Sequence, residues 1–176
     1  MTLPNLITIA RLLLVPLVVV AISTAQWRIA FVLFVLAGVS DAIDGFLARR
    51  LNMRSELGAY LDAITDKALL VSIYVALSVT GVLPGWVAIL VVSRDLMIIA
   101  AIVLSWVLNK PVAINPLWIS KLNTAAQIAF AALVLGANAF ALELGIAERI
   151  GLVTVAALTV TSVGAYLALW LRHMTA

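Results

Sequence analysis

The 176-residue sequence predicts an all-α, polytopic membrane protein in which six transmembrane helices form one bundle. Hydrophobic residues make up 65% of the chain and charged residues only 11%, and the mean hydropathy is +1.22. Soluble domains carry roughly 25% charged residues, so these charges are too few to cover a globular surface. The apolar residues also fall into runs of about 20, the length that crosses a bilayer. We expect a single membrane domain over residues 1–176.

Six apolar runs are expected to be the spans, in the order 5–24, 28–49, 56–80, 84–108, 117–140 and 147–172. Short polar or turn-forming stretches separate them, beginning with Gln26-Trp27 and residues 50–54 and continuing with 81–85, 109–116 and 143–149. Such short connections predict antiparallel neighbours in a compact bundle. The start of the chain is not expected to be a cleavable signal peptide, because Arg11 interrupts its apolar run.

Basic residues predict the orientation of the spans. Six spans place both termini on one side, which then carries Arg49, Arg50, Arg54, Lys110, Lys121 and Arg172, against Arg28 and Arg149 on the other side. The positive-inside rule assigns the first side to the cytoplasm. We expect a bacterial inner-membrane protein with both termini and the active site facing the cytoplasm, and a mitochondrial inner membrane is the alternative. The net charge of +3 suits contact with lipid headgroups, and no nucleic-acid partner is expected.

Ionisable residues inside apolar runs are the first candidates for function. A charge at the centre of a spanning helix costs about 2.5–3.5 kcal/mol on insertion scales, so such residues should face the bundle interior or water. In this chain they are Arg11, Asp41, Asp44, Asp62, Asp66, Lys67, Arg94, Asp95 and Lys121.

The aspartates are spaced so that each pair shares a helix face. Asp41 and Asp44 lie on one face of the second span, together with Ala48. Asp62 and Asp66 lie four residues apart on the third span, which is its antiparallel neighbour. The two pairs can therefore face each other near the cytoplasmic side. Four carboxylates in one low-dielectric pocket repel one another, so protons or cations must neutralise some of them. Hard oxygen ligands suit Mg²⁺, Mn²⁺ or Ca²⁺.

Small residues lie beside these acids. Gly45 and Ala48 on the second span and Gly58 on the third keep their helix faces thin, which permits either close helix packing or the approach of a bulky ligand. Arg49 is placed to bind a diphosphate through its forked guanidinium.

Residues 41–66, DAIDGFLARRLNMRSELGAYLDAITD, resemble the signature of the CDP-alcohol phosphatidyltransferase family, D-x2-D-G-x2-A-R-x8-G-x3-D-x3-D. The match holds at every fixed position: Asp41, Asp44, Gly45, Ala48, Arg49, Gly58, Asp62 and Asp66. The six-span layout also fits this family. The resemblance implies transfer of a phosphatidyl group from CDP-diacylglycerol to an alcohol with release of CMP, and it suggests a homodimer.

The resemblance also implies residue roles. Two divalent ions, Mg²⁺ or Mn²⁺, would bind to Asp41, Asp44, Asp62 and Asp66, and Asp66 would also be the general base. The CDP moiety would contact Asp44, Gly45, Ala48, Arg49 and Gly58.

The acceptor is predicted from the fourth and fifth spans, which resemble two subfamilies. The subfamily that uses glycerol 3-phosphate usually has R-E, a second arginine eight residues after the first, and K-x-K-T. This chain has Arg94-Asp95, then Ile102, and later Lys121-Leu122-Asn123-Thr124. A phosphomonoester carries about −1.5 to −2 charge and needs more cations than a phosphodiester. The loss of two basic groups favours the other subfamily, which uses phosphatidylglycerol and makes cardiolipin. Arg94 and Lys121 are the candidates for binding the acceptor phosphate.

Other interpretations of the same residues stay open. Intramembrane carboxylates also occur in metal- or proton-coupled transporters. The acids can instead pair with Arg11, Arg49, Lys67 and Arg94 as structural ion pairs, and Arg11 can either reach a ligand or extend to the membrane surface. The five tryptophans are expected to be interfacial anchors. His173 is expected to be a solvated residue of the C-terminal tail.

Overall fold

The computed structural model describes residues 3–50, 56–107 and 117–175, and it describes no side chains at 3–9, 44–50, 56–64, 102, 106 and 174–175. The described residues form six helices and no strand: α1 Leu3–Ser23, α2 Trp27–Arg50, α3 Glu56–Val79, α4 Gly85–Val107, α5 Trp118–Phe140 and α6 Ile146–Thr175. Each helix corresponds to one predicted span, with ends that differ by no more than about three residues, as expected for helix boundaries read from sequence. The all-α prediction is confirmed.

The same capping geometry ends three of the helices. Ala25 after α1, Gly81 after α3 and Ala141 after α5 have positive φ values of 55°, 76° and 54°. In each case the amide of the following residue donates to a carbonyl five residues earlier, at 2.8–2.9 Å. This satisfies carbonyls that the helix end would otherwise leave open. Glycine adopts this conformation without strain, whereas each alanine costs roughly 1–2 kcal/mol.

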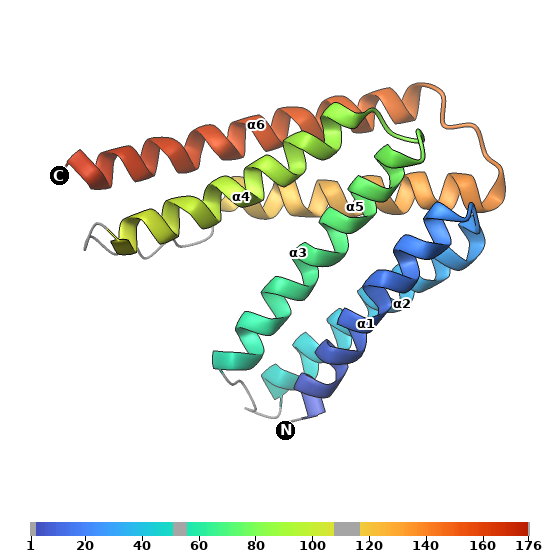
Figure 1. Cartoon of the computed structure of the whole chain (residues 1–176), viewed down its shortest axis with the longest axis horizontal. Helices are drawn as coiled ribbons and strands as arrows, with labels where there is room; N and C mark the ends of the chain where they lie inside the picture. The colour runs from blue at the N-terminus through green and yellow to red at the C-terminus, as the bar shows by residue number, and fades with distance from the viewer. Residues whose placement is uncertain (1–2, 51–55, 108–116, 176) are drawn as a thin grey trace. The chain divides into compact units, whose positions relative to one another are not determined.

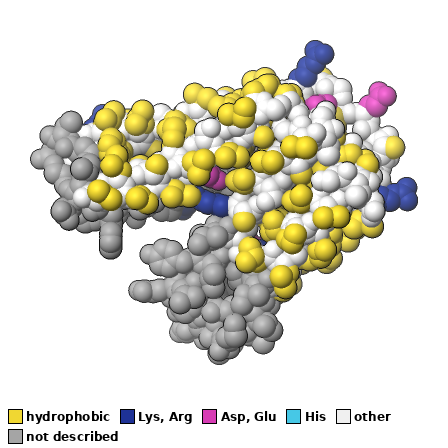
Figure 2. Space-filling model, in the orientation of Figure 1, with side chains coloured by type: hydrophobic (Ala, Val, Ile, Leu, Met, Phe, Trp, Pro, Cys, Tyr) yellow, Lys and Arg dark blue, Asp and Glu magenta, His cyan; other side chains and the backbone are white. Residues whose placement is uncertain are grey.

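Three helical segments in the described part of the chain are long and apolar enough to cross a membrane: Gly85–Ser105, Trp118–Phe140 and Ile146–His173. A shorter apolar segment, Ala10–Ser23, lies in α1. Large hydrophobic side chains are exposed on several helices; Leu13 is 66% and Val153 67% accessible. Figure 2 shows hydrophobic side chains spread over the described surface in that view, with few charged ones among them. Such surfaces suit lipid rather than water.

The first of two compact units comprises Met1–Leu83 and Ala131–Leu144. Here α1 packs against both α2 and α3 (Figure 1). Val18 of α1 and Ile73 of α3 are fully buried. Gly136 of α5 leaves room for the Phe31 ring of α2, because a Cβ atom at position 136 would lie 3.2 Å from that ring. α1 is therefore the element that joins the two helices of the acidic motif.

The second unit comprises Pro84–Phe130 and Gly145–Ala176. In this unit α4 packs against α6 (Figure 1). Val87 and Val91 of α4 and Val155 of α6 are buried in this unit. Gly151 permits a close approach between α6 and Phe130, since a Cβ atom at position 151 would lie 2.2 Å from the ring carbon Cδ2.

Candidate functional site

The first and last aspartates of the acidic motif meet at one arginine. Nη1 of Arg11, on α1, lies 2.6 Å from Oδ1 of Asp41 on α2 and 2.7 Å from Oδ1 of Asp66 on α3. The arginine side chain is fully enclosed, whereas the two aspartate side chains are 42% and 43% exposed. The guanidinium of Arg11 is thus buried among the helices, and the two carboxylates lie between it and the protein surface.

The burial of Arg11 shows that one interpretation of the sequence was wrong. An arginine that extends to the membrane surface would have an exposed guanidinium, but that of Arg11 is 0% accessible. Two carboxylates stabilise the charge where it lies, so the side chain has no need to reach water. The interpretation of the acids as ion-pair partners holds for Asp41 and Asp66, although their exposure leaves them accessible to a ligand.

The remaining motif residues belong to the same two helices. Asp44, Gly45, Ala48 and Arg49 lie in α2, and Gly58 and Asp62 lie in α3. Their side chains are outside the described residues, so the predicted contacts of these six positions stay predictions.

The predicted metal site can be tested only on the two described acids. No group of three or more His, Cys, Asp or Glu residues suited to a metal is found among the side chains that are described. Asp41 and Asp66 do fit a divalent cation, because each directs a carboxylate oxygen at the same positive group, the guanidinium of Arg11. Carboxylate oxygens are ligands that divalent cations such as Mg²⁺ use. Metal binding by all four aspartates stays a prediction.

Arg94, expected to bind the acceptor phosphate, is a junction of three helices in the second unit. It is 3% exposed, and its Nη1 lies 2.5 Å from Oδ1 of Asp95 on the same helix, α4. Its Nε and Nη2 donate to Ser162 of α6 at 3.4 and 3.3 Å, and Nη2 also donates to Ser120 of α5. These contacts give Arg94 a packing role, and its role at the acceptor stays a prediction. Lys121, the other candidate, is exposed on α5.

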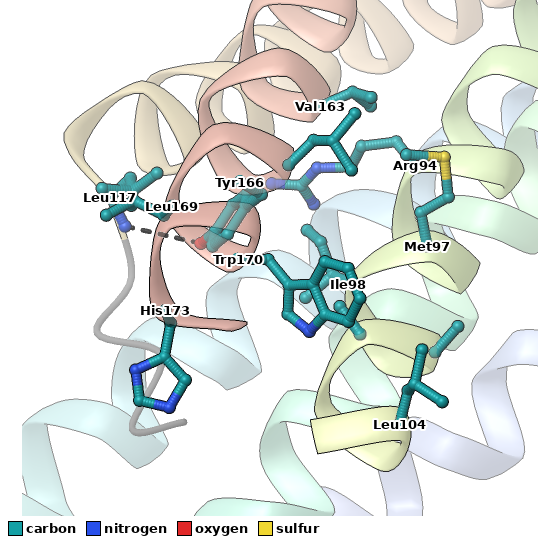
Figure 3. Close-up of a pocket in the computed structure, with 13 residues that line it drawn as sticks. Arg94, Met97, Ile98, Leu104, Leu117, Val163, Tyr166, Leu169, Trp170 and His173 are labelled. Atoms are coloured by element: carbon teal, nitrogen blue, oxygen red, sulfur yellow. Dashed lines mark hydrogen bonds between the residues drawn. The ribbon is translucent and has the colours of Figure 1, made fainter. Parts of the chain in front are cut away.

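A mainly apolar cavity of about 510 Å³ lies between α4 and α6, with Arg94 in its wall. Figure 3 shows the Arg94 side chain extending from α4 toward Tyr166 and Val163 of α6. Met97, Ala101 and Trp170 line other parts of the wall. A cavity of this size and lining matches sites that hold apolar parts of small ligands.

This cavity was not predicted from the sequence. Trp170, predicted to be an interfacial anchor, is half-buried in its wall, and His173 lines it while remaining exposed, as expected of a solvated tail residue. Trp170 Nε1 donates to Oγ of Ser105 at 2.9 Å, a contact between α6 and α4. The available signal was the helical spacing of Arg94, Ala101 and Ser105, which places a cation, a small residue and a hydroxyl on one face of α4.

A buried polar cluster surrounds Asn123, the position at which the resemblance to the glycerol 3-phosphate subfamily implies a lysine. Asn123 of α5 is fully buried, and its Oδ1 accepts a hydrogen bond from Thr159 of α6 at 3.0 Å. Gln127 donates to the same threonine at 3.5 Å. A lysine at position 123 would place a charge in this interior at high cost. Asn123 therefore joins α5 to α6, and no cation is present at this position.

An all-α chain with acids from neighbouring helices gathered at one position, and with long apolar helices, defines a helical protein of membrane type with an acidic site. The family model described as CDP-alcohol phosphatidyltransferase matches residues 1–171. This chain belongs to the CDP-alcohol phosphatidyltransferase family, as the motif at 41–66 predicted.

Individual relatives fall into two groups by name. The chain is 36% identical over 155 residues to "Cardiolipin synthase (CMP-forming)" of Homo sapiens, a match that covers 79% of this chain and 52% of the human protein. The protein of the same name from Rattus norvegicus is 34% identical over 155 residues, covering 79% of this chain and 51% of the relative. "Probable phosphatidylglycerophosphate synthase" of Mycobacterium tuberculosis (strain CDC 1551 / Oshkosh) is 35% identical over 131 residues. This match covers 71% of this chain and 61% of the mycobacterial protein. The chain spans about half the length of the first two relatives.

Proposed function

We propose that this protein transfers a phosphatidyl group from CDP-diacylglycerol to an alcohol acceptor and releases CMP. Membership of the family over residues 1–171 supports this activity. One observation carries the proposal. Asp41 of α2 and Asp66 of α3, the outer acids of the motif, contact the same nitrogen of Arg11. Carboxylates gathered in this way suit the binding of a cation-neutralised diphosphate.

In this proposal Asp41, Asp44, Asp62 and Asp66 hold two divalent cations, Mg²⁺ or Mn²⁺, which would offset the charge of the donor diphosphate. Gly45, Ala48 and Gly58, together with Asp44 and Arg49, line the site for the CDP moiety. The small residues leave space for the nucleotide, and the Arg49 guanidinium suits a diphosphate oxygen pair.

Asp66 is the proposed general base. The acceptor hydroxyl oxygen forms a bond to the phosphorus of the phosphatidyl group, the bond from that phosphorus to the CMP oxygen breaks, and the hydroxyl proton passes to Asp66. A carboxylate that is 43% exposed, as that of Asp66 is, can be approached by an acceptor from outside the helix packing. General-base assistance typically contributes about 10²–10⁴-fold to a rate.

Phosphatidylglycerol is the proposed acceptor, and cardiolipin the product. The names of the human and rat relatives support this choice. Asn123 also supports it, because that position contributes no cation for a phosphomonoester. The apolar cavity beside Arg94 suits a lipid better than a small, fully polar molecule. Arg94 and Lys121 are the proposed contacts for the acceptor phosphate.

Glycerol 3-phosphate is the second candidate acceptor, with phosphatidylglycerol phosphate as the product. The observation in its favour is the 35% identity to the mycobacterial protein named as a probable phosphatidylglycerophosphate synthase.

We further infer that all six helices span the membrane, with both termini and the active site in the cytoplasm of a bacterium, and that the protein is a homodimer. The basic residues on the predicted cytoplasmic side support this orientation. The apolar exposed faces of the helices support contact with lipid or a second copy.

A two-acceptor assay tests the proposal. Purified protein receives labelled CDP-diacylglycerol with either phosphatidylglycerol or glycerol 3-phosphate, with EDTA or with Mg²⁺ or Mn²⁺. We expect CMP and cardiolipin with phosphatidylglycerol only when the metal is present. Turnover with glycerol 3-phosphate alone would assign the second acceptor. Metal or proton flux across vesicles without CMP release would contradict the transferase and favour a transporter.

A further inference from the structure

Arg11 uses the same carboxylate oxygens that a metal would need. Its Nη1 contacts Oδ1 of both Asp41 and Asp66, at 2.6 and 2.7 Å. A divalent cation bound to those oxygens would compete with the guanidinium for their lone pairs and would place a second positive charge beside it. The guanidinium and a metal on these oxygens therefore share ligands, and each weakens the binding of the other.

The burial of Arg11 keeps its guanidinium beside the two aspartates. The arginine side chain is completely enclosed, and Val15 and Val18 on the same helix are also buried, so α1 fixes the position of the guanidinium from inside. The aspartates are 42% and 43% exposed, so a metal reaches them from the open side. Arg11 cannot withdraw into solvent, and its charge stays near any metal that binds.

Without a positive charge between them, two carboxylates held this close would repel each other. The guanidinium offsets this repulsion and positions both acids through charge-assisted hydrogen bonds. When a divalent ion arrives, the same charge repels it, because like charges a few ångströms apart interact strongly in a partly buried site. One residue thus stabilises the acidic site in the absence of metal and weakens its binding of metal.

We propose that Arg11 is a built-in counter-ion that holds Asp41 and Asp66 in place when no metal is bound and competes with divalent cations for them. Arg11 is a positioning residue in this proposal. The inference rests on the proposed metal site of the transferase, and it predicts that removal of the Arg11 charge tightens metal binding. An arginine with a purely structural role would, when lost, leave metal affinity unchanged or reduced.

The test compares R11M, R11K and R28M in the full chain. Arg28 is an exposed arginine whose Nε donates to the carbonyl of Ala139, and it lies roughly 20 Å along α2 from Asp41. R28M is therefore a matched control that removes one positive charge away from the acids. The measurements are the Mn²⁺ dissociation constant, from the electron paramagnetic resonance of free Mn²⁺, and thermal unfolding in EDTA and in Mn²⁺.

We expect R11M to lower the Mn²⁺ dissociation constant by about tenfold, which corresponds to ~1.4 kcal/mol. R11M should also melt at a lower temperature than wild type in EDTA and should gain more from added Mn²⁺. R11K keeps the charge but not the guanidinium geometry, so its dissociation constant should lie between those of wild type and R11M. R28M should match wild type in its Mn²⁺ dissociation constant and in the gain in melting temperature on adding Mn²⁺. Unchanged or weaker Mn²⁺ binding by R11M would overturn the proposal.

A measurement on the wild-type protein covers the case in which R11M fails to fold. The side-chain nitrogen resonances of Arg11, assigned with R11K, are followed by NMR while Mg²⁺ is added. We expect the Arg11 Nη resonance to move as the ion takes over the carboxylates, and an Arg11 resonance that stays fixed at saturating Mg²⁺ would contradict the proposal.

A D41N variant separates the two levels of inference. If wild type binds Mn²⁺ and D41N binds it more weakly, the metal site of the proposed function stands, and an unchanged R11M then removes only the role of Arg11. If wild-type protein binds no Mn²⁺, the metal site fails and the competition fails with it.

Discussion

Asp41 and Asp66 lie on different helices, yet the Oδ1 atom of each contacts the same nitrogen of Arg11, at 2.6 and 2.7 Å. Two acids at opposite ends of a 26-residue motif are thereby brought to one position. Their chemical roles in the proposed transferase differ, since both bind metal but only Asp66 also accepts a proton. Substitution of each acid can therefore separate the two roles.

The first prediction concerns D66N and D41N. We expect D66N to lower the rate of phosphatidyl transfer by at least about 10²-fold, because asparagine removes a proton acceptor worth roughly 10²–10⁴-fold. D41N should also be slow, but a higher Mn²⁺ concentration should restore part of its activity, since that variant lacks only a ligand. CMP release at a series of Mn²⁺ concentrations measures both effects.

The matched control for these variants is E143Q. Glu143 is exposed in the connection between α5 and α6, and its loss removes one negative charge outside the motif. This variant should keep wild-type turnover. Full activity of D66N, or its rescue by Mn²⁺ to the same degree as D41N, would remove the general-base assignment.

The second prediction concerns Arg94 and Asp95. The two side chains are 4% and 14% exposed, so R94L removes the guanidinium that pairs with a largely buried carboxylate. Removal of one partner of a buried pair costs roughly 3–5 kcal/mol of unfolding free energy, whereas removal of both partners is often nearly neutral. We expect R94L to be strongly destabilised and R94L/D95L to recover most of the lost stability, as measured by denaturant unfolding in detergent.

The double variant also tests the acceptor role of Arg94. A folded R94L/D95L protein should have a raised KM for phosphatidylglycerol and an unchanged KM for CDP-diacylglycerol. Wild-type kinetics in the stable double variant would show that Arg94 only joins α4 to Ser120 and Ser162.

The third prediction concerns the cavity between α4 and α6. Ala101 lines it, so A101F would fill part of its volume of about 510 Å³. If the cavity holds an apolar part of the acceptor lipid, A101F should raise the KM for phosphatidylglycerol by about an order of magnitude, because it would displace about two methylene groups worth ~0.8 kcal/mol each. V103F is the control, since Val103 is 56% exposed on the same helix. Equal kinetic constants in the two variants would exclude the cavity from acceptor binding.

The helices could be predicted from sequence because the thickness of the bilayer sets their lengths. A bilayer requires apolar runs of about 20 residues with all backbone groups bonded internally, so each run predicts one helix. Gly81 marked a helix end in the sequence and has the positive φ of such an end in the structure. Helical spacing also predicted that Asp62 and Asp66 share a face of α3, and this stays a prediction because the Asp62 side chain lies outside the described residues.

The partners of buried charges could not be predicted in the same way. Arg11 is 55 residues from Asp66 along the chain, and only the packing of α1 against α2 and α3 brings it to both acids. Several basic residues were candidates for such pairing, and nothing in their spacing selected Arg11. The contact of Trp170 with Ser105 was missed for a similar reason, because it depends on how α4 meets α6. A cavity is a property of this packing and leaves little trace in composition.

The last prediction concerns Gly151 and Gly164, both in α6. An alanine Cβ at position 151 would lie 2.2 Å from Cδ2 of Phe130, whereas nothing lies within 4 Å of a Cβ at position 164. In G151A the buried Phe130 ring must move, and such overpacking typically costs about 1–3 kcal/mol. In G164A the same substitution should be neutral or should stabilise the helix by up to about 1 kcal/mol, because alanine favours the helix more than glycine does. Both variants change helix propensity equally, so the difference between their unfolding free energies isolates the contact with Phe130. Equal stabilities would mean that α6 does not approach Phe130 this closely.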